Sequence, residues 1–190
     1  ANQMFQYASL KGIARKHGYD FAIPPKEVFG QYDPLVRGDN LNIYDVFDLE
    51  SKNNIQITKN QVFVERMHEF DVELFNKCSD NVDLYGYFQS SKYFDHIRNE
   101  IKSDFTFTKE TQSICDEMFD SFDNGRNVIS LHIRRTDYTS NPNHPLQPMS
   151  YYEEALKKFD RNEHIIVFSD DPDWCQQQKL FDNDDILISE

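Results

Sequence analysis

Apolar and polar positions alternate in a regular order along the second half of the chain. Short apolar runs occupy residues 127–133, 164–168 and 186–188, and such runs bounded by turn residues are typical of buried strands. Residues 151–159, and the segment that begins at Pro172, have the spacing and start signals of helices. This β-α-β-α-β order predicts an α/β fold with a parallel, doubly wound sheet.

The first half of the chain has a less regular pattern. Residues 2–17 form a helical pattern that ends at Gly18, a residue typical of helix C-termini. Gly12 lies on a face of this helix that is expected to approach a sheet closely. Residues 19–23 are interpreted as a strand that follows the helix. The remaining predicted elements are strands at 55–57, 62–64 and 83–88, and helices capped by Ser91 and Thr108.

Local signals also predict where the later helices begin and where the lobes divide. Ser150 and Glu153 match a capping box, and Asp171 before Pro172 matches a helix N-terminus. Asn124-Gly125 interrupts the helical pattern, so we expect two lobes, residues 1–124 and residues 125–190. Both ends of the sequence lie inside or next to a predicted element, so the C-terminal lobe is expected to be truncated. Self-association through that lobe is expected from apolar side chains left partly uncovered, namely Trp174, Phe181, Ile186 and Ile188.

The principal candidate site follows the strand 127–133. His132, Arg134, Arg135 and Asp137 stand at its end, where ligands bind in open parallel sheets. Arginine keeps its charge and offers a planar set of donors that suits phosphate. Arg135 has no acidic partner on its own strand, so its loss is expected to remove most nucleotide binding and to spare the fold, and Arg134 is expected to behave similarly. His132 suits proton transfer and a buried structural hydrogen bond equally.

A second polar cluster follows the strand 164–168. Ser169 and Asp170 are predicted to support the nucleotide or the sheet edge. Asp171 and Asp173 match an Asp-x-Asp metal signature, but Pro172 between them favours Asp171 as a helix cap, a role that asparagine fills equally well. We therefore expect no metal at this cluster.

Asn2 and Gln3 begin the first helix and form a third candidate site. Free N–H groups at a helix N-terminus bind anions, although Asn2 also suits a simple cap. Asp137 is a candidate general base, but in strict alternation it shares a side with Arg135. That placement also allows Asp137 to orient an arginine instead.

Composition narrows the range of partners. The chain has 20 Lys and Arg against 33 Asp and Glu, a net charge of −13, so it is not a general nucleic-acid binder. The three cysteines are odd in number and far apart in the sequence, which indicates neither a disulfide framework nor a zinc site. The sequence contains no signal peptide and no membrane-length apolar run. We expect a cytoplasmic protein, with peripheral association with the inner membrane face left open.

The sequence resembles the bacterial-type α-1,2-fucosyltransferases of glycosyltransferase family 11. The matching motifs follow in the family's order over nearly the whole chain: Asn-Gln-Met-Phe-Gln-Tyr-Ala at 2–8, Gly-Tyr-Phe-Gln-Ser at 86–90, His-Ile-Arg-Arg-Thr-Asp-Tyr at 132–138, Pro-Met-Ser-Tyr-Tyr at 148–152 and Phe-Ser-Asp-Asp at 168–171. Thr136 departs from the family, which commonly has glycine there. The family's usual residues before Asn2 and after Ile188 are not in the sequence.

The resemblance implies a GT-B architecture with two Rossmann-like lobes. It also implies GDP-fucose as donor, a galactose-type hydroxyl of a glycan as acceptor, inversion at the anomeric carbon, and no cofactor. Two alternatives stay open: a metal-dependent nucleotide-sugar transferase that uses Asp171 and Asp173, and a truncated non-catalytic protein that binds a nucleotide or glycan.

Overall fold

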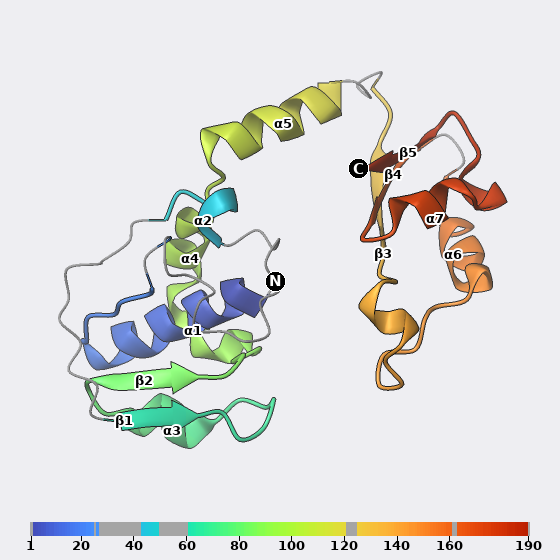
Figure 1. The fold of residues 1–190 in the computed structure, drawn as a ribbon. Helices are drawn as coiled ribbons and strands as arrows, with labels where there is room; N and C mark the ends of the chain where they lie inside the picture. Colours follow the sequence, from blue (N-terminus) through green and yellow to red (C-terminus); the bar gives the residue numbers. More distant parts are fainter. Residues whose placement is uncertain are drawn as a thin grey trace. The chain divides into compact units, whose positions relative to one another are not determined.

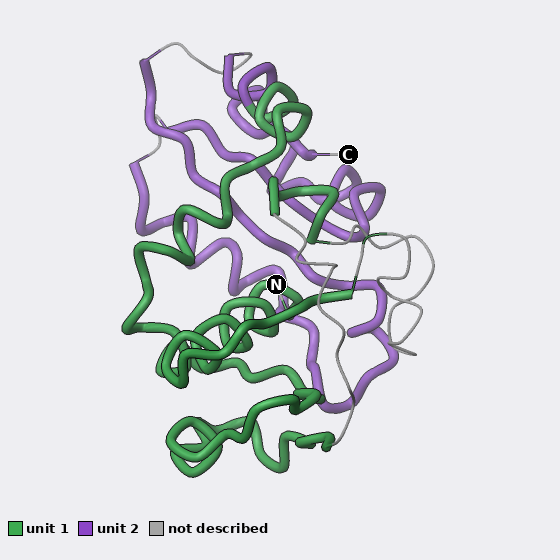
Figure 2. Tube along the Cα trace, turned by 90° about the vertical axis from the view of Figure 1, so that its left-hand side faces the viewer, with its two compact units in different colours: residues 1–115 green, residues 116–190 purple. Residues whose placement is uncertain are grey.

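The chain has a mixed α/β fold that divides into two compact units, residues 1–115 and residues 116–190 (Figure 2). The predicted lobe boundary, 124/125, lies nine residues further along the chain, and residues 121–124 are outside the described part of the chain. The computed structural model describes residues 2–24, 26, 43–49, 61–120, 125–160 and 163–189. The strand predicted at 55–57 lies outside these ranges.

Unit 1 contains a parallel pair of strands with a helix as their crossover (Figure 1). Val64 of one strand lies opposite Tyr85 of the other, so the strands end side by side. The predicted strand at 62–64 is therefore confirmed, whereas the one predicted at 83–88 ends at Tyr85, because residues 86–88 form a loop. The elements are α1 (Asn2–His17), α2 (Ile43–Val46), β1 (Gln61–Val64), α3 (Val72–Lys77), β2 (Val82–Tyr85), the 3-10 turns η2 (Ser91–Tyr93) and η3 (Asp95–Ile97), α4 (Arg98–Asp104) and α5 (Lys109–Asp120), which crosses into unit 2.

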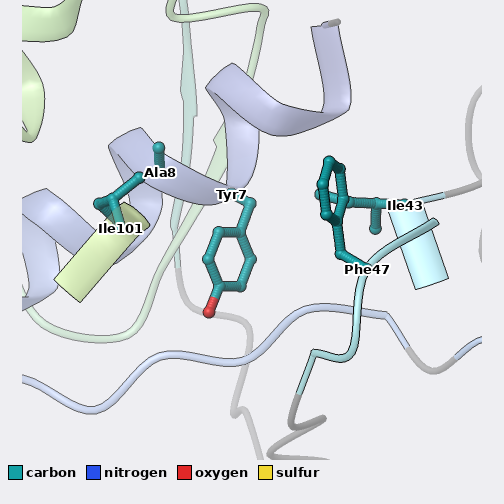
Figure 3. Close-up of a cluster of buried hydrophobic side chains, with 5 residues drawn as sticks. All are labelled: Tyr7, Ala8, Ile43, Phe47 and Ile101. Carbon is teal, nitrogen blue, oxygen red and sulfur yellow. The ribbon is translucent and has the colours of Figure 1, made fainter. Parts of the chain in front are cut away.

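One hydrophobic cluster of unit 1 surrounds Tyr7 of α1 (Figure 3). Burial of these apolar side chains stabilises the packing of α1 against the segments that follow it in sequence. The Tyr7 hydroxyl donates to Asp104 Oδ2 at 2.9 Å, and the buried Lys11 ammonium bonds the same oxygen at 2.5 Å. The buried members are Tyr7, Ala8, Ile43, Phe47 and Ile101.

A second cluster joins α1 to α3 and to the segment after β2. Its buried members are Ile13, Leu74, Phe88 and Tyr93. Gly12 permits this packing, because a Cβ atom at that position would lie 2.1 Å from the carbonyl oxygen of Tyr93. The close approach predicted for this helix face is therefore present, although the neighbour is a 3-10 turn rather than a sheet.

Unit 2 contains a three-stranded parallel sheet in the order β3-β4-β5. Both α6 and α7 pack on one face of it, because right-handed crossovers between sequential strands return on the same side. The cluster on this face includes Ile133, Val167, Tyr152 and Cys175. The elements are β3 (Val128–Ile133), η4 (Asp137–Thr139), α6 (Met149–Leu156), β4 (His164–Ser169), α7 (Pro172–Gln176), η5 (Lys179–Phe181) and β5 (Ile186–Ser189). The predicted parallel sheet is confirmed, and a doubly wound arrangement stays a prediction.

Several local predictions were wrong. Residues 19–24 form no strand, because Phe21 and Ile23 pack against the Tyr7 cluster instead of pairing with a neighbour. Ser91 caps no long helix, since the chain forms two 3-10 turns there and the Ser91 hydroxyl donates to Asp95. Phe181 is buried rather than uncovered, because η5 folds it onto the unit 2 cluster.

Of three other predicted helix starts, one is wrong and two are confirmed. The capping box of Ser150 and Glu153 is absent, because α6 begins at Met149 and Ser150 already lies inside its first turn. Asp171 caps α7 as predicted, accepting a hydrogen bond from the Trp174 N–H. Thr108 likewise accepts from the Thr111 N–H at the start of α5. Across the described ranges, every helix is too short or too polar to cross a bilayer.

Gly12→Ala is expected to destabilise unit 1. Alanine favours helices, but here its methyl group meets the Tyr93 backbone, and overpacking of this kind costs about 1–3 kcal/mol. Chemical denaturation followed by circular dichroism would measure the loss. Arg15→Ala on the exposed side of the same helix is the control and should change the free energy of unfolding much less. A Gly12→Ala protein as stable as the wild type would contradict the close contact.

Candidate functional site

The carboxyl ends of β3 and β4 bring the two predicted polar clusters together. Ile133 lies opposite Ser169 at the end of the paired register, so the residues that follow each strand meet at one edge. The Ser169 hydroxyl donates to the Ile133 carbonyl at 2.9 Å and accepts from the Asp171 N–H at 3.0 Å. Both hydrogen-bonding functions of Ser169 therefore hold this edge together.

Asp170 is the acceptor around which the edge is built. Its carboxylate accepts from the Arg135 backbone N–H at 2.8 Å and from the Thr136 hydroxyl, and it lies 3.2 Å from the Arg134 Nε. Burial alone raises the pKa of Asp170, but the hydrogen bonds from Thr136 and Arg135 and the charge of Arg134 leave it below its usual value. Asp170 is thus an ionised anchor for the turn after β3.

Arg134 is the more accessible of the two arginines, with its side chain 44% exposed. Its Nε donates to Asp137 Oδ1 at 2.9 Å. This hydrogen bond raises the pKa of Arg134 and lowers the pKa of Asp137. Within the described residues, the terminal nitrogens of Arg134 have no hydrogen-bond partner. They remain available to an anion.

Arg135 is held more tightly, with its side chain only 18% exposed. Its Nε donates to Asp171 Oδ2 at 3.0 Å, and its guanidinium carbon lies 3.7 Å from the centre of the Trp174 ring. Both partners come from α7 or its cap, so Arg135 connects the end of β3 to the start of α7. A charge-assisted bond and a cation–π contact at a partly buried site both contribute to stability. The expectation that Arg135 can be lost without effect on the fold therefore disagrees with its contacts.

Asp137 and His132 have separate surroundings. Asp137 contacts Arg134 rather than Arg135, because the chain turns into η4 and strand alternation ends there. His132 is exposed rather than buried, on the face of the sheet opposite the packed helices, beside Phe168 in the register. This exposure disagrees with a buried structural histidine.

The metal signature is not assembled into a site within the described ranges, where no group of three or more His, Cys, Asp or Glu side chains is arranged for a metal ion. Asp171 uses Oδ1 for the helix cap and Oδ2 for Arg135. Asp171 therefore has two structural roles, the predicted helix cap and the contact with Arg135.

Unit 1 has a polar edge of its own at the carboxyl ends of β1 and β2. Asn2 stands at the start of α1, next to Gln3, and its side-chain carbonyl accepts from Gln89 Nε2 at 2.7 Å. Gln6 donates to the Gly86 carbonyl at 2.8 Å, and Ser9 donates to the Phe88 carbonyl at 3.0 Å. The two motifs at 2–8 and 86–90 thus form one hydrogen-bonded group.

Three residues of these edges were missed as functional candidates. From the sequence, Trp174 is only an apolar side chain, Thr136 is only a departure from the family pattern, and Glu65 is not among the predicted site residues. Glu65 accepts from the N–H groups of Tyr87 and Phe88. Only its position directly after a predicted strand could have indicated it.

The comparisons with known proteins agree with the motif pattern. The model of Glycosyl transferase family 11 matches residues 1–189. The O-antigen biosynthesis glycosyltransferase WbnK of Escherichia coli is 30% identical over 156 residues, which is 75% of this chain and 50% of WbnK. An alpha-1,2-colitosyltransferase of the same species is 28% identical over 208 residues, covering 94% of this chain and 68% of the relative.

A mammalian protein is also similar. The galactoside 2-alpha-L-fucosyltransferase SEC1 of Bos taurus is 24% identical over 202 residues, covering 99% of this chain and 52% of SEC1. The matched part is thus between half and about two thirds of the length of these relatives. No solved structure matches the chain. Because the family model matches nearly every residue, the chain belongs to glycosyl transferase family 11.

Proposed function

We propose that this protein transfers L-fucose from GDP-fucose to a galactose-type hydroxyl of a glycan, forming an α-1,2 linkage with inversion and without a metal ion. In this proposal the units act as the two lobes of a GT-B enzyme, unit 2 on the donor side and unit 1 on the acceptor side. Family membership supports sugar transfer. The names of the colitosyl- and fucosyltransferase relatives support a sugar of this kind and the α-1,2 linkage.

The observation that carries the donor assignment is the accessible guanidinium of Arg134. Its Nε is fixed by Asp137 and Asp170, which orients the group before any ligand arrives. A preorganised charge aimed at a leaving phosphate stabilises the transition state more than the ground state. Arg134 would thus bind the diphosphate of GDP directly, while Arg135 holds the edge to α7.

The reaction needs stabilisation of charge on the leaving group. The acceptor oxygen forms a bond to the anomeric carbon of fucose as the bond from that carbon to the β-phosphate oxygen breaks. Negative charge grows on the phosphate and is met by Arg134, and the hydroxyl proton leaves to a base. Asp137 is a weak base while it is paired with Arg134, because its pKa is lowered. Exposed His132 has no such partner within the described residues, which makes it the other candidate for the base.

The metal-dependent alternative is less well supported. Both carboxylate oxygens of Asp171 already have partners, the Trp174 N–H and Arg135. A metal would have to displace the helix cap or the arginine. Donor identity can be tested with GDP-fucose beside GDP-colitose, and the metal requirement by adding EDTA to either assay.

The two arginines are expected to differ when each is replaced by alanine. Arg134→Ala should weaken GDP binding about 10–100-fold, the size of a lost charge-assisted contact, and leave the melting temperature unchanged. Arg135→Ala, in contrast, should lower the melting temperature, because it removes the contacts with Asp171 and Trp174. Calorimetric titration of GDP and thermal unfolding would measure these effects.

Arg98→Ala is the control for both variants. Arg98 makes an exposed ion pair with Asp95 in unit 1, so its loss should affect neither GDP affinity nor stability appreciably. If Arg134→Ala bound GDP as tightly as the wild type, the donor assignment would be wrong.

Asp171→Asn separates the structural roles of Asp171 from metal binding. Asparagine keeps the helix cap but loses the charge that pairs with Arg135, so unfolding should become easier by about 1–2 kcal/mol. Activity should be retained with EDTA present and should not respond to Mn²⁺. Activity that vanished in Asp171→Asn and in EDTA-treated wild type alike would instead favour the metal-dependent reaction.

A further inference from the structure

We infer that Glu65 is a positioning residue that fixes the segment 86–90 so that Gln89 and Asn2 bind hydroxyl groups of the glycan acceptor. The identity of the acceptor rests on the proposed function. The arrangement itself rests on the hydrogen bonds at the carboxyl edge of β1 and β2.

Glu65 follows the last residue of β1 and uses both carboxylate oxygens on the neighbouring loop. Oε2 accepts from the Tyr87 N–H at 2.7 Å, and Oε1 accepts from the Phe88 N–H at 3.0 Å. Its own N–H donates to the Tyr85 carbonyl at 2.8 Å. Gly86 permits this approach, because a Cβ atom there would lie 2.4 Å from the Glu65 Cβ. Hydrogen bonds to a carboxylate are stronger than those between neutral groups.

The loop that Glu65 holds has an unfavourable backbone conformation. Phe88 has φ of +49°, which a bulky residue adopts only at a cost in free energy. Its side chain is buried and its carbonyl is bound by the Ser9 hydroxyl. The Phe88 N–H bond to Glu65 completes this restraint, so the backbone is held on both sides of Phe88, and the next residue, Gln89, is exposed.

Gln89 and Asn2 form an exposed pair of amides. One hydrogen bond joins them, from Gln89 Nε2 to Asn2 Oδ1. In the part of the chain that the structure describes, Gln89 Oε1 and Asn2 Nδ2 have no protein partner. The pair therefore offers one acceptor and a donor group close together, which matches neighbouring hydroxyls of a sugar. It stands beyond the carboxyl ends of parallel strands, where ligands of α/β sheets bind.

The local charge favours the neutral acceptor over the anionic donor. The Glu65 carboxylate lies next to this loop and no cation contacts it within the described residues. A diphosphate at the same edge would meet that negative charge, whereas a hydroxyl would not. The edge of unit 2 also has carboxylates, but they are paired with arginines and the guanidinium of Arg134 is accessible there.

The test compares Glu65→Gln, Gln89→Ala and the control Glu69→Gln in the whole protein, with lactose as acceptor. Glutamine at 65 has one acceptor oxygen for two N–H groups, so KM for lactose should rise about tenfold, with kcat and GDP affinity nearly unchanged. Gln89→Ala should raise KM similarly without a change in melting temperature. Glu69 is an exposed carboxylate for which no contact is found in the described ranges, and Glu69→Gln should have no effect.

A second measurement does not depend on turnover. Lactose is titrated into GDP-saturated protein while the side-chain amide signals of Gln89 are followed by NMR, and the Gln89 signals should shift. If the Gln89 signals shift but no fucose is transferred, the acceptor site is supported and the proposed reaction is wrong.

Kinetic results can also support the proposed reaction while rejecting the acceptor site. Fucose transfer with unchanged lactose KM in Glu65→Gln and Gln89→Ala would overturn the acceptor site and leave the reaction standing. A Glu65→Gln protein that lost kcat, GDP affinity and melting temperature together would show a general structural role instead. If lactose neither shifted the signals nor accepted fucose, both proposals would fail.

Discussion

A carboxylate placed just beyond a parallel strand holds each candidate edge together. Parallel strands end with backbone N–H groups that no neighbouring strand satisfies, and such groups need other acceptors. In unit 2, Asp170 follows β4 and accepts from the backbone of Arg135, beyond β3. In unit 1, Glu65 follows β1 and accepts from the backbone of Tyr87 and Phe88, beyond β2. Both carboxylates stand directly after the last pair of the strand register.

This arrangement explains why the candidate site residues lie where they do. Once Asp170 fixes the turn after β3, Arg134 and Arg135 take different environments although they are adjacent in sequence. Arg135 is bound by the cap and first turn of α7, and Arg134 stays accessible. The same principle in unit 1 exposes Gln89 and buries Phe88. Both edges carry carboxylates, but the unit 2 edge also has the accessible guanidinium of Arg134, and this difference is the basis for proposing different ligands for them.

The sequence predicted the elements that depend on local signals. The apolar runs of β3, β4 and β5 and the Asp171-Pro172 start of α7 are confirmed, because periodicity and capping act within a few residues. Residues 19–23 share the composition of a strand, but they pack into the Tyr7 cluster. A strand requires a neighbour to pair with, and its absence cannot be read from the segment itself.

The site was predictable to the level of residue types but not of partners. The arginine pair and the aspartates after β4 were identified from their places at strand ends. The contacts of Arg135 with Asp171 and Trp174 span more than thirty residues, and no local pattern encodes them. Glu65 was missed for the same reason, because the backbone N–H groups that donate to it lie more than twenty residues further along the chain, in the loop after β2.

The contact between Arg135 and Trp174 makes the intrinsic tryptophan fluorescence sensitive to the position of Arg135. Trp174 is the single tryptophan of the chain, and a guanidinium lies 3.7 Å from the centre of its ring. Indole emission depends on charges near the ring, so the tryptophan fluorescence of this chain originates beside the carboxyl edge of β3 and β4. A ligand that moves Arg135 by a small distance changes the colour or intensity of that emission without any label. Trp174, which packs against Arg135, therefore also reports movements of Arg135 through its fluorescence.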